Sequence, residues 1–170
     1  MIFQHTHELV LNGTKTQTRR IQKPWQALMR FDFGEASTDP LHGKPFVCDT
    51  RTGRVVYQAG KTYAVQSGRG QPAIGRIYIE DISSQDVREI SDVDVCAEGF
   101  VFKADFLKTW TQMHDKPAFG YLMADLMAGE YQRLGMTVPL HVWAEWENYL
   151  QNRPAERYQA WVLEFQLVRS

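Results

Sequence analysis

The ten residues Asn12–Ile21, NGTKTQTRRI, decide how the rest of the chain is interpreted. After Gly13 they place one lysine, three threonines and two arginines, and only Ile21 is apolar. A buried strand would alternate apolar and polar residues, so this stretch forms either a solvated strand or the wall of a polar site. Arginine offers a planar fork for phosphate or carboxylate, lysine a charge whose pKa shifts on burial, and threonine a hydroxyl that can donate, accept or attack.

The spacing of these polar residues limits which of them can share a site. Side chains alternate along a strand, which puts Thr16, Thr18 and Arg20 on one face. Lys15 has the opposite parity to Thr18. For both to reach one site, Lys15 must lie in the turn before the regular strand, or the strand must contain a bulge.

The composition is that of an ordinary globular protein. The chain has 170 residues, 44% hydrophobic and 23% charged, with a net charge of −1, and we expect residues 1–170 to form a single domain. No apolar run is long enough to span a membrane, and no secretory signal is apparent. We therefore expect no contact with a membrane. The chain has two cysteines, Cys48 and Cys96, which fit no metal-ligand spacing, and we expect a reduced, cytoplasmic protein. Its oligomeric state is left open.

The charges are unevenly distributed along the chain. Basic residues dominate the first thirty positions, and acidic residues dominate positions 80–94. A basic end beside an acidic middle suggests a localised phosphate-facing patch; a solvated surface of mixed charge is the alternative. The basic residues of the first part are Lys15, Arg19, Arg20, Lys23 and Arg30.

The pattern of apolar residues and turn signals predicts an α+β fold of several short strands interrupted by helices. Gly75 indicates a bulge or a close backbone approach, and Ser91 begins a Ser-x-x-Asp capping pattern. We expect helices over 6–11 and 91–98 and strands over 61–66, 73–82 and 158–168. A long irregular loop over 24–60 should contain only a hairpin between 46–48 and 55–57. Ile74, Ile77 and Ile79 should be buried positions of the strand over 73–82. Three helices should each bury one face, and Pro139 fits the first turn of the third. The residues of these faces are Phe102, Phe106, Leu107, Trp110 and Met113 in the first helix, Phe119, Leu122, Met123, Leu126 and Met127 in the second, and Trp143, Trp146 and Leu150 in the third.

Aromatic residues alternate with cations in the long loop. Trp25, Phe31 and Phe33 are interspersed with Lys23 and Arg30. Such aromatic rings can stack on nucleic-acid bases while the cations neutralise phosphate. They can equally pin the loop to the core, and the sequence favours that structural role.

Three segments, in order, resemble the motifs of ASCH-domain proteins. Residues 13–20 resemble the family's G-x-K-T-x-T-x-R motif, residues 65–77 its glycine-rich turn and central strand, and residues 91–100 its Ala-Glu-Gly-Phe segment. The resemblance implies a small PUA-like β-barrel with surrounding helices, from a family that handles RNA or modified bases. A helical insertion at about 117–152, before the last strand, has no counterpart in the shortest ASCH proteins and is similar to longer forms found in phages and prophages.

The resemblance also implies a site. Some ASCH proteins remove the acetyl group from acetylated cytidine with a lysine, a threonine and a glutamate, which correspond to Lys15, Thr18 and Glu98. In such an amidohydrolase Thr18 would attack, Lys15 would act as base, and Glu98 would orient the lysine or pass a proton to the leaving amine. The residues expected to bind nucleoside or single-stranded RNA are Thr16, Arg19, Arg20, Tyr63 and Arg69.

Two other activities remain open at this point. One is a metal-dependent ribonuclease in which Lys15, Arg69 and Tyr63 handle phosphate; the other is a non-catalytic RNA-binding module. The five histidines are scattered and none pairs with a second ligand at metal spacing. Walker and Rossmann fingerprints are also missing from the sequence. We therefore expect no resident metal or other cofactor.

Overall fold

The protein is described by a computed structural model that covers residues 1–3, 6–34, 38–128 and 140–168. In the described residues one short helix precedes six consecutive strands, and four further α-helices come before the last strand, as expected for an α+β protein. The elements are α1 His7–Leu11, β1 Gln17–Ile21, β2 Gln26–Arg30, β3 Pro45–Asp49, β4 Arg54–Gln58, β5 Thr62–Gln66, β6 Ala73–Asp86, α2 Asp92–Ala97, α3 Lys103–His114, α4 Lys116–Ala128, α5 Leu140–Gln151 and β7 Gln159–Leu167, with 3₁₀ turns at Val87–Glu89 and Ala155–Arg157.

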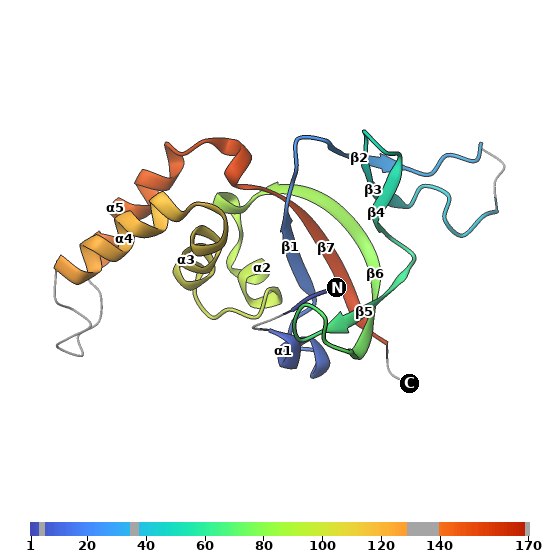
Figure 1. Cartoon of the computed structure of the whole chain (residues 1–170), viewed down its shortest axis with the longest axis horizontal. Helices are drawn as coiled ribbons and strands as arrows, with labels where there is room; N and C mark the ends of the chain where they lie inside the picture. Colours follow the sequence, from blue (N-terminus) through green and yellow to red (C-terminus); the bar gives the residue numbers. More distant parts are fainter. Residues whose placement is uncertain (4–5, 35–37, 129–139, 169–170) are drawn as a thin grey trace.

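The strands form two antiparallel sheets. One has the order β1-β7-β6-β5 and the other the order β2-β3-β4. Figure 1 shows the long strand β6 curving through the larger sheet, with α2 and α3 next to β1, α4 and α5 farther out on that side, and the β2–β3–β4 sheet on the opposite side. The expectation of a curled, barrel-like sheet with helices around it is confirmed, in the form of a half-barrel.

Apolar side chains fill the space between these layers in three clusters. Ile79, Ile82 and Leu163 of the larger sheet belong to one cluster, which Val47 of the second sheet completes. A second cluster joins α1 to the far end of the same sheet through Val10 and Phe165. The third and largest is helical, and its members include Leu107, Trp110, Leu122, Trp146, Leu150 and Tyr158.

Gly75 allows α1 to pack closely on β6. A Cβ built at this position would lie 2.7 Å from Cδ2 of Leu11, a distance that real Cβ atoms do not adopt. The pairing register of β5 with β6 also shifts between Val65 and Gln66. The two predictions for Gly75, a β-bulge and a close approach of a neighbouring segment, are therefore both confirmed at this end of the sheet.

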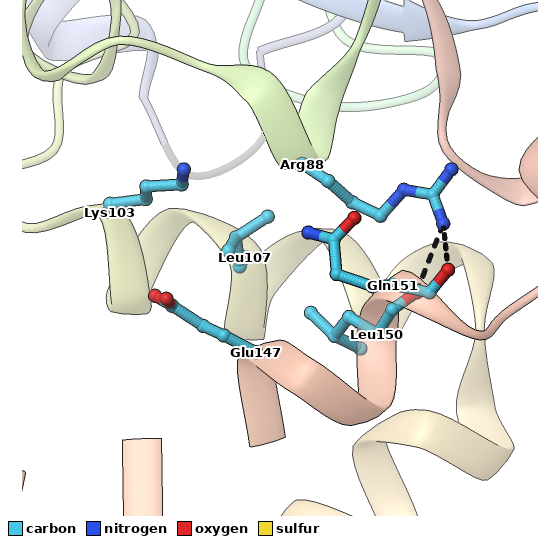
Figure 2. Close-up of a pocket in the computed structure, with 6 residues that line it drawn as sticks. All are labelled: Arg88, Lys103, Leu107, Glu147, Leu150 and Gln151. Atoms are coloured by element: carbon cyan, nitrogen blue, oxygen red, sulfur yellow. Dashed lines mark hydrogen bonds between the residues drawn. The ribbon is translucent and has the colours of Figure 1, made fainter. Parts of the chain in front are cut away.

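Two helix ends are fixed by side chains. The Ser91 hydroxyl accepts a hydrogen bond from the Asp94 amide at 3.2 Å, which confirms the predicted cap of α2. Arg88 donates to the carbonyls of Leu150 and Gln151 at 3.1 and 3.2 Å and so satisfies the C-terminal end of α5. Figure 2 shows this contact at the rim of a small crevice of about 30 Å³ that Lys103 and Glu147 also line.

Asp115 ties the helices to the last strand. It follows α3 and is fully buried. Its carboxylate accepts two hydrogen bonds from Arg153, both at 2.9 Å, one from Arg157 at 2.8 Å and one from the Tyr158 hydroxyl at 2.9 Å. These bonds hold the pKa of Asp115 at about 2, against the effect of burial, which alone would raise it. The junction fixes the helical cluster against β7.

Several expectations from the sequence are wrong. The segment 24–60 is not a mainly irregular loop, because Gln26–Arg30 forms β2 and pairs in register with β3. Ile74 is exposed at the register shift near the start of β6, and Phe102 and Met113 are exposed at the two ends of α3. Pro139 and the side chains of Leu126 and Met127 lie outside the described residues. Among the described helices, none combines the length and apolarity required to cross a bilayer.

Candidate functional site

Lys15 is positioned by the turn between α1 and β1. Gly13 ends the helix with a φ of +81°, a conformation that glycine adopts without strain. The Lys15 amide then donates to the Leu9 carbonyl at 2.9 Å, and the Thr16 amide donates to the Ala97 carbonyl at 3.0 Å. Lys15 therefore precedes the regular strand, which begins at Gln17. This is the first of the two arrangements that the parity argument allowed.

Glu98 reaches the same point from α2. It is the C-cap residue that directly follows the helix, and its amide donates to the Asp94 carbonyl. Gly99 follows with a φ of +87°, and a Cβ there would lie 2.7 Å from Cδ1 of Leu9. The helix end thus packs directly on α1. This packing fixes Glu98 beyond the edge of β1.

Three charged side chains form a buried network at this edge. The Lys15 ammonium donates to Oε2 of Glu98 and, at 2.6 Å, to the Glu98 carbonyl. Arg19 donates to Oε1 of Glu98 at 3.2 Å. Lys15 and Glu98 are each 4% exposed, and Arg19 is 6% exposed. Buried charges at this depth require paired and hydrogen-bonded partners, and Glu98 supplies them to both cations.

Arg19 enters the network from the opposite face of the sheet. Because side chains alternate along β1, Thr18 and Arg20 share one face, whereas Arg19 on the other face donates to Gln85 at 2.7 and 3.0 Å and lies 3.4 Å from Asp94. Side chains from both faces of β1 can reach Glu98 because β1 is an edge strand of the sheet. Arg19 is thus committed to buried protein partners, although part of it also lines the cavity described next.

A cavity of about 460 Å³ opens between β1 and α3. Its size falls within the range of about 300–1,000 Å³ that is usual for small-molecule sites. One part of its wall is aromatic and apolar, and the other carries the charged network. The lining residues are Ile2, Phe3, Thr6, Lys15, Thr18, Arg19, Arg20, Glu98, Phe100, Phe106, Thr109, Trp110 and Met113. The cavity therefore brings Lys15, Thr18, Glu98, Arg19 and Arg20 to one place.

Arg20 is the least committed cation of the cavity. Its Nη2 donates to the Ile2 carbonyl at 2.7 Å, and its guanidinium lies 5.3 Å from the centroid of the Phe3 ring. Its Nε is buried and has no hydrogen-bond acceptor within the part of the chain that the structure describes. No carboxylate among those residues forms an ion pair with it. A buried donor without a partner costs about 1–3 kcal/mol, which a ligand oxygen or nitrogen would offset.

Thr18 and Lys15 have the properties that nucleophilic chemistry requires. Thr18 is 5% exposed and lines the cavity, and its hydroxyl makes no hydrogen bond to any described residue. Burial lowers the pKa of the Lys15 ammonium below its ordinary value of 10.5, and the positive charges of Arg20 and Arg19 act in the same direction. Glu98 opposes the shift by stabilising the charged form. A lowered pKa makes the neutral amine, which can accept a proton, easier to reach.

Three residues expected to bind substrate do not line this cavity. Thr16 is exposed directly before β1 begins, and Arg69 is exposed in the turn after β5. Tyr63 is half-buried and packs against the apolar clusters under the sheets. Conversely, the sequence assigned Trp110 and Phe106 to the core alone, whereas they also form the cavity wall. Their helical spacing showed a buried face but not that this face is opposite β1.

The described residues contain no group of three or more histidine, cysteine, aspartate or glutamate side chains arranged to hold a metal ion. The candidate site is therefore built from amine, hydroxyl, guanidinium and carboxylate groups, with aromatic rings opposite.

Comparison with protein-family models and with curated proteins gives no match. Two solved structures are similar in fold. One is an ASCH domain from Lactobacillus crispatus JV V101, with 16% identity and a TM-score of 0.44, and the match covers 95% of this chain and 69% of that one. The other is a protein of family DUF984 from Enterococcus faecalis V583, with 12% identity, a TM-score of 0.44 and the same coverage. The first bears the name of the family that the sequence motifs resemble.

Proposed function

We propose that the cavity between β1 and α3 binds an acylated nucleoside, of the acetylated cytidine type, and hydrolyses its amide. The observation that carries the proposal is a single cavity that holds the buried Lys15–Glu98 pair, a Thr18 hydroxyl without a hydrogen bond to any described residue, and an aromatic wall. Amide hydrolysis needs a nucleophile, a base and stabilisation of the developing oxyanion. Side chains suited to each of these roles line this one cavity.

In the proposed reaction Thr18 Oγ1 attacks the acetyl carbonyl carbon while neutral Lys15 takes the hydroxyl proton. Collapse of the tetrahedral intermediate breaks the C–N bond. The proton on Lys15 passes to the exocyclic nitrogen, which leaves as the free amine of cytidine. Water then attacks the acetyl ester of Thr18 and gives its proton to Lys15. The ester bond breaks, the Thr18 oxygen recovers the proton held by Lys15, and acetic acid leaves and gives its remaining proton to solvent to become acetate. Glu98 orients Lys15 throughout.

Arg20 and the aromatic wall would hold the substrate. The unpartnered Nε of Arg20 is a donor suited to a carbonyl oxygen or a developing oxyanion. Phe100, Phe106 and Trp110 offer apolar surface for a planar base. An apolar wall together with a charged edge favours a ligand with one flat face and one polar, acylated edge.

The test is direct incubation of the purified protein with acetylated cytidine, with cytidine and acetate measured by chromatography. Thr18→Ala should leave almost no hydrolysis, whereas Thr18→Ser keeps a hydroxyl and should retain substantial activity. Lys15→Met should lose about 10²- to 10⁴-fold, the usual contribution of a general base. Thr14→Ala is the matched control, because Thr14 lies in the same motif but is exposed outside the cavity.

Hydrolysis at the native rate by Thr18→Ala would refute the nucleophile assignment. A native protein that leaves acetylated cytidine intact but cleaves single-stranded RNA only when a divalent ion is present would favour the ribonuclease alternative. Binding of the nucleoside without turnover, measured by calorimetry, would favour the non-catalytic module. The folded state of each variant should be verified by circular dichroism, since Lys15 is part of a buried ion network.

A further inference from the structure

A second hollow lies on the smaller sheet and shares no lining residue with the cavity. Its volume is about 300 Å³, and we refer to it as the Trp25 hollow. It combines a half-buried indole with three cations and a single carboxylate. The lining residues are Lys23, Trp25, Gln26, Asp49, Arg51, Arg54 and Val56.

The centre of the hollow is a stacked pair of Trp25 and Arg51. The guanidinium carbon of Arg51 lies 4.0 Å from the centroid of the indole ring. Asp49 holds the guanidinium in place, accepting from Nε at 3.2 Å and from Nη2 at 2.8 Å. The Arg51 side chain is nevertheless 57% exposed. A fixed, planar, positively charged group is thus presented to solvent, a surface on which bases stack.

Two further cations, Lys23 and Arg54, flank this pair, and neither has an acidic partner among the described residues. Lys23 lies 5.8 Å from the Trp25 ring centroid, and neither Lys23 nor Arg54 forms a side-chain hydrogen bond or ion pair to any described residue. Asp49 balances the charge of Arg51. The charges of Lys23 and Arg54 therefore remain unneutralised at the rim of the hollow.

The fold does not depend on these side-chain contacts to place Trp25. The Trp25 carbonyl accepts from both the amide and the hydroxyl of Thr50, at 2.8 and 3.0 Å, which already joins the start of β2 to the end of β3. None of the three cations takes part in these two hydrogen bonds. Their arrangement around a flat ring is accounted for by a ligand with alternating planar and anionic groups.

We propose that the Trp25 hollow binds single-stranded nucleic acid, with a base stacked on the Trp25–Arg51 pair and with Lys23 and Arg54 contacting the adjacent phosphates. Trp25 lies five positions after Arg20 of the cavity in the sequence, so their Cα atoms lie at most about 18 Å apart. One strand can therefore meet both sites. This last link rests on the proposed function, whereas binding at the hollow does not.

The test is fluorescence anisotropy with labelled oligouridine and oligodeoxythymidine over a salt series, using probes without acetylated bases. The variant Lys23→Gln/Arg54→Gln should bind more weakly than the native protein. The slope of log K against log salt should shrink by about 1.4, since each phosphate contact on a single strand contributes about 0.7. The matched control Lys61→Gln/Arg76→Gln removes the same charge from exposed positions outside both sites and should bind as the native protein does.

A second pair of variants probes stacking. Trp25→Phe keeps an aromatic face, and Trp25→Leu removes it, so only the leucine variant should lose about tenfold or more in affinity. Native affinity in Lys23→Gln/Arg54→Gln, or equal loss in the two charge variants, would overturn the proposal. Equally tight binding of polyglutamate would also overturn it, because the hollow would then recognise charge alone.

The proposed function and this inference can fail separately. If acetylated cytidine is not hydrolysed but the Lys23→Gln/Arg54→Gln variant still loses oligonucleotide binding, the hollow stands and the hydrolase proposal falls. If both proposals hold, that variant should lower kcat/KM for an acetylated oligonucleotide while leaving hydrolysis of the free nucleoside unchanged.

Discussion

Replacing Asp115 with asparagine tests the junction between the helices and the last strand. Asp115→Asn keeps the shape of the side chain but removes the charge that accepts four hydrogen bonds from Arg153, Arg157 and Tyr158. The new amide group would also point two donors at a site where only donors converge. The variant should therefore be destabilised, and the loss should depend on pH.

The magnitude follows from the pKa of the carboxyl group. That pKa is about 2 in the folded protein against an ordinary 3.8. At about 1.36 kcal/mol per unit, the difference corresponds to roughly 2.5 kcal/mol of folding stability. Between these two pKa values the unfolded chain binds more protons than the folded one, so stability increases with pH. The contribution is complete above about pH 5 and is lost as the pH falls through 4 towards 2.

The assay is urea unfolding at several pH values from 3 to 7, for the native protein and for Asp115→Asn. At pH 7 the variant should be less stable by about 2.5 kcal/mol or more, and the difference should narrow below pH 4. Asp105→Asn is the control, because Asp105 is an exposed aspartate of α3 and should change stability by only about 0.5 kcal/mol. A constant difference between native and Asp115→Asn across this pH range would refute the reasoning.

Three further outcomes are expected. The kcat/KM for acetylated cytidine should rise with pH up to the lowered pKa of Lys15, because only the neutral amine can act as base; a profile that falls over that range would contradict this role. Trp146→Ala should cost about 3–5 kcal/mol in urea unfolding, because the ring is 1% exposed, and an unchanged midpoint would show that it is not core. Gly99→Ala should cost more than about 1 kcal/mol, through its φ of +87° and the clash with Leu9, and should lower hydrolysis by displacing Glu98; a fully stable variant would contradict the packing of α2 on α1.

The local parts of the fold were predictable because their causes are local. The Ser91 cap, the stop at Gly99 and the alternation along the last strand depend on residues within a few positions of one another. The strand β2 was missed because only Ala27, Leu28 and Met29 are apolar in it and two of these three are exposed. It is stabilised by pairing with β3, a contact that no pattern within residues 24–34 indicates.

The composition of the cavity could be predicted only in part, for the same reason. The parity rule left two ways for Lys15 to reach the cavity, from the turn before the strand or through a bulge, and the resemblance to ASCH proteins indicated Glu98. The role of Arg19 could not be deduced, because its partners Gln85 and Glu98 are 66 and 79 residues away in sequence. Likewise, nothing local distinguishes Trp110 on the cavity wall from Trp146 in the core.

The position of β7 in the larger sheet has a consequence for how the protein is made. It lies between β1 and β6, so β1 pairs with residues about 147 positions later, as in the contact of Gln17 with Glu164. The hairpins β3–β4 and β5–β6 can close while later residues are still being synthesised, but β1 must wait for β7. Such distant pairing makes folding slow. The polar, basic character of β1 is suited to this delay, because a charged strand with a single apolar residue is a poor template for aggregation.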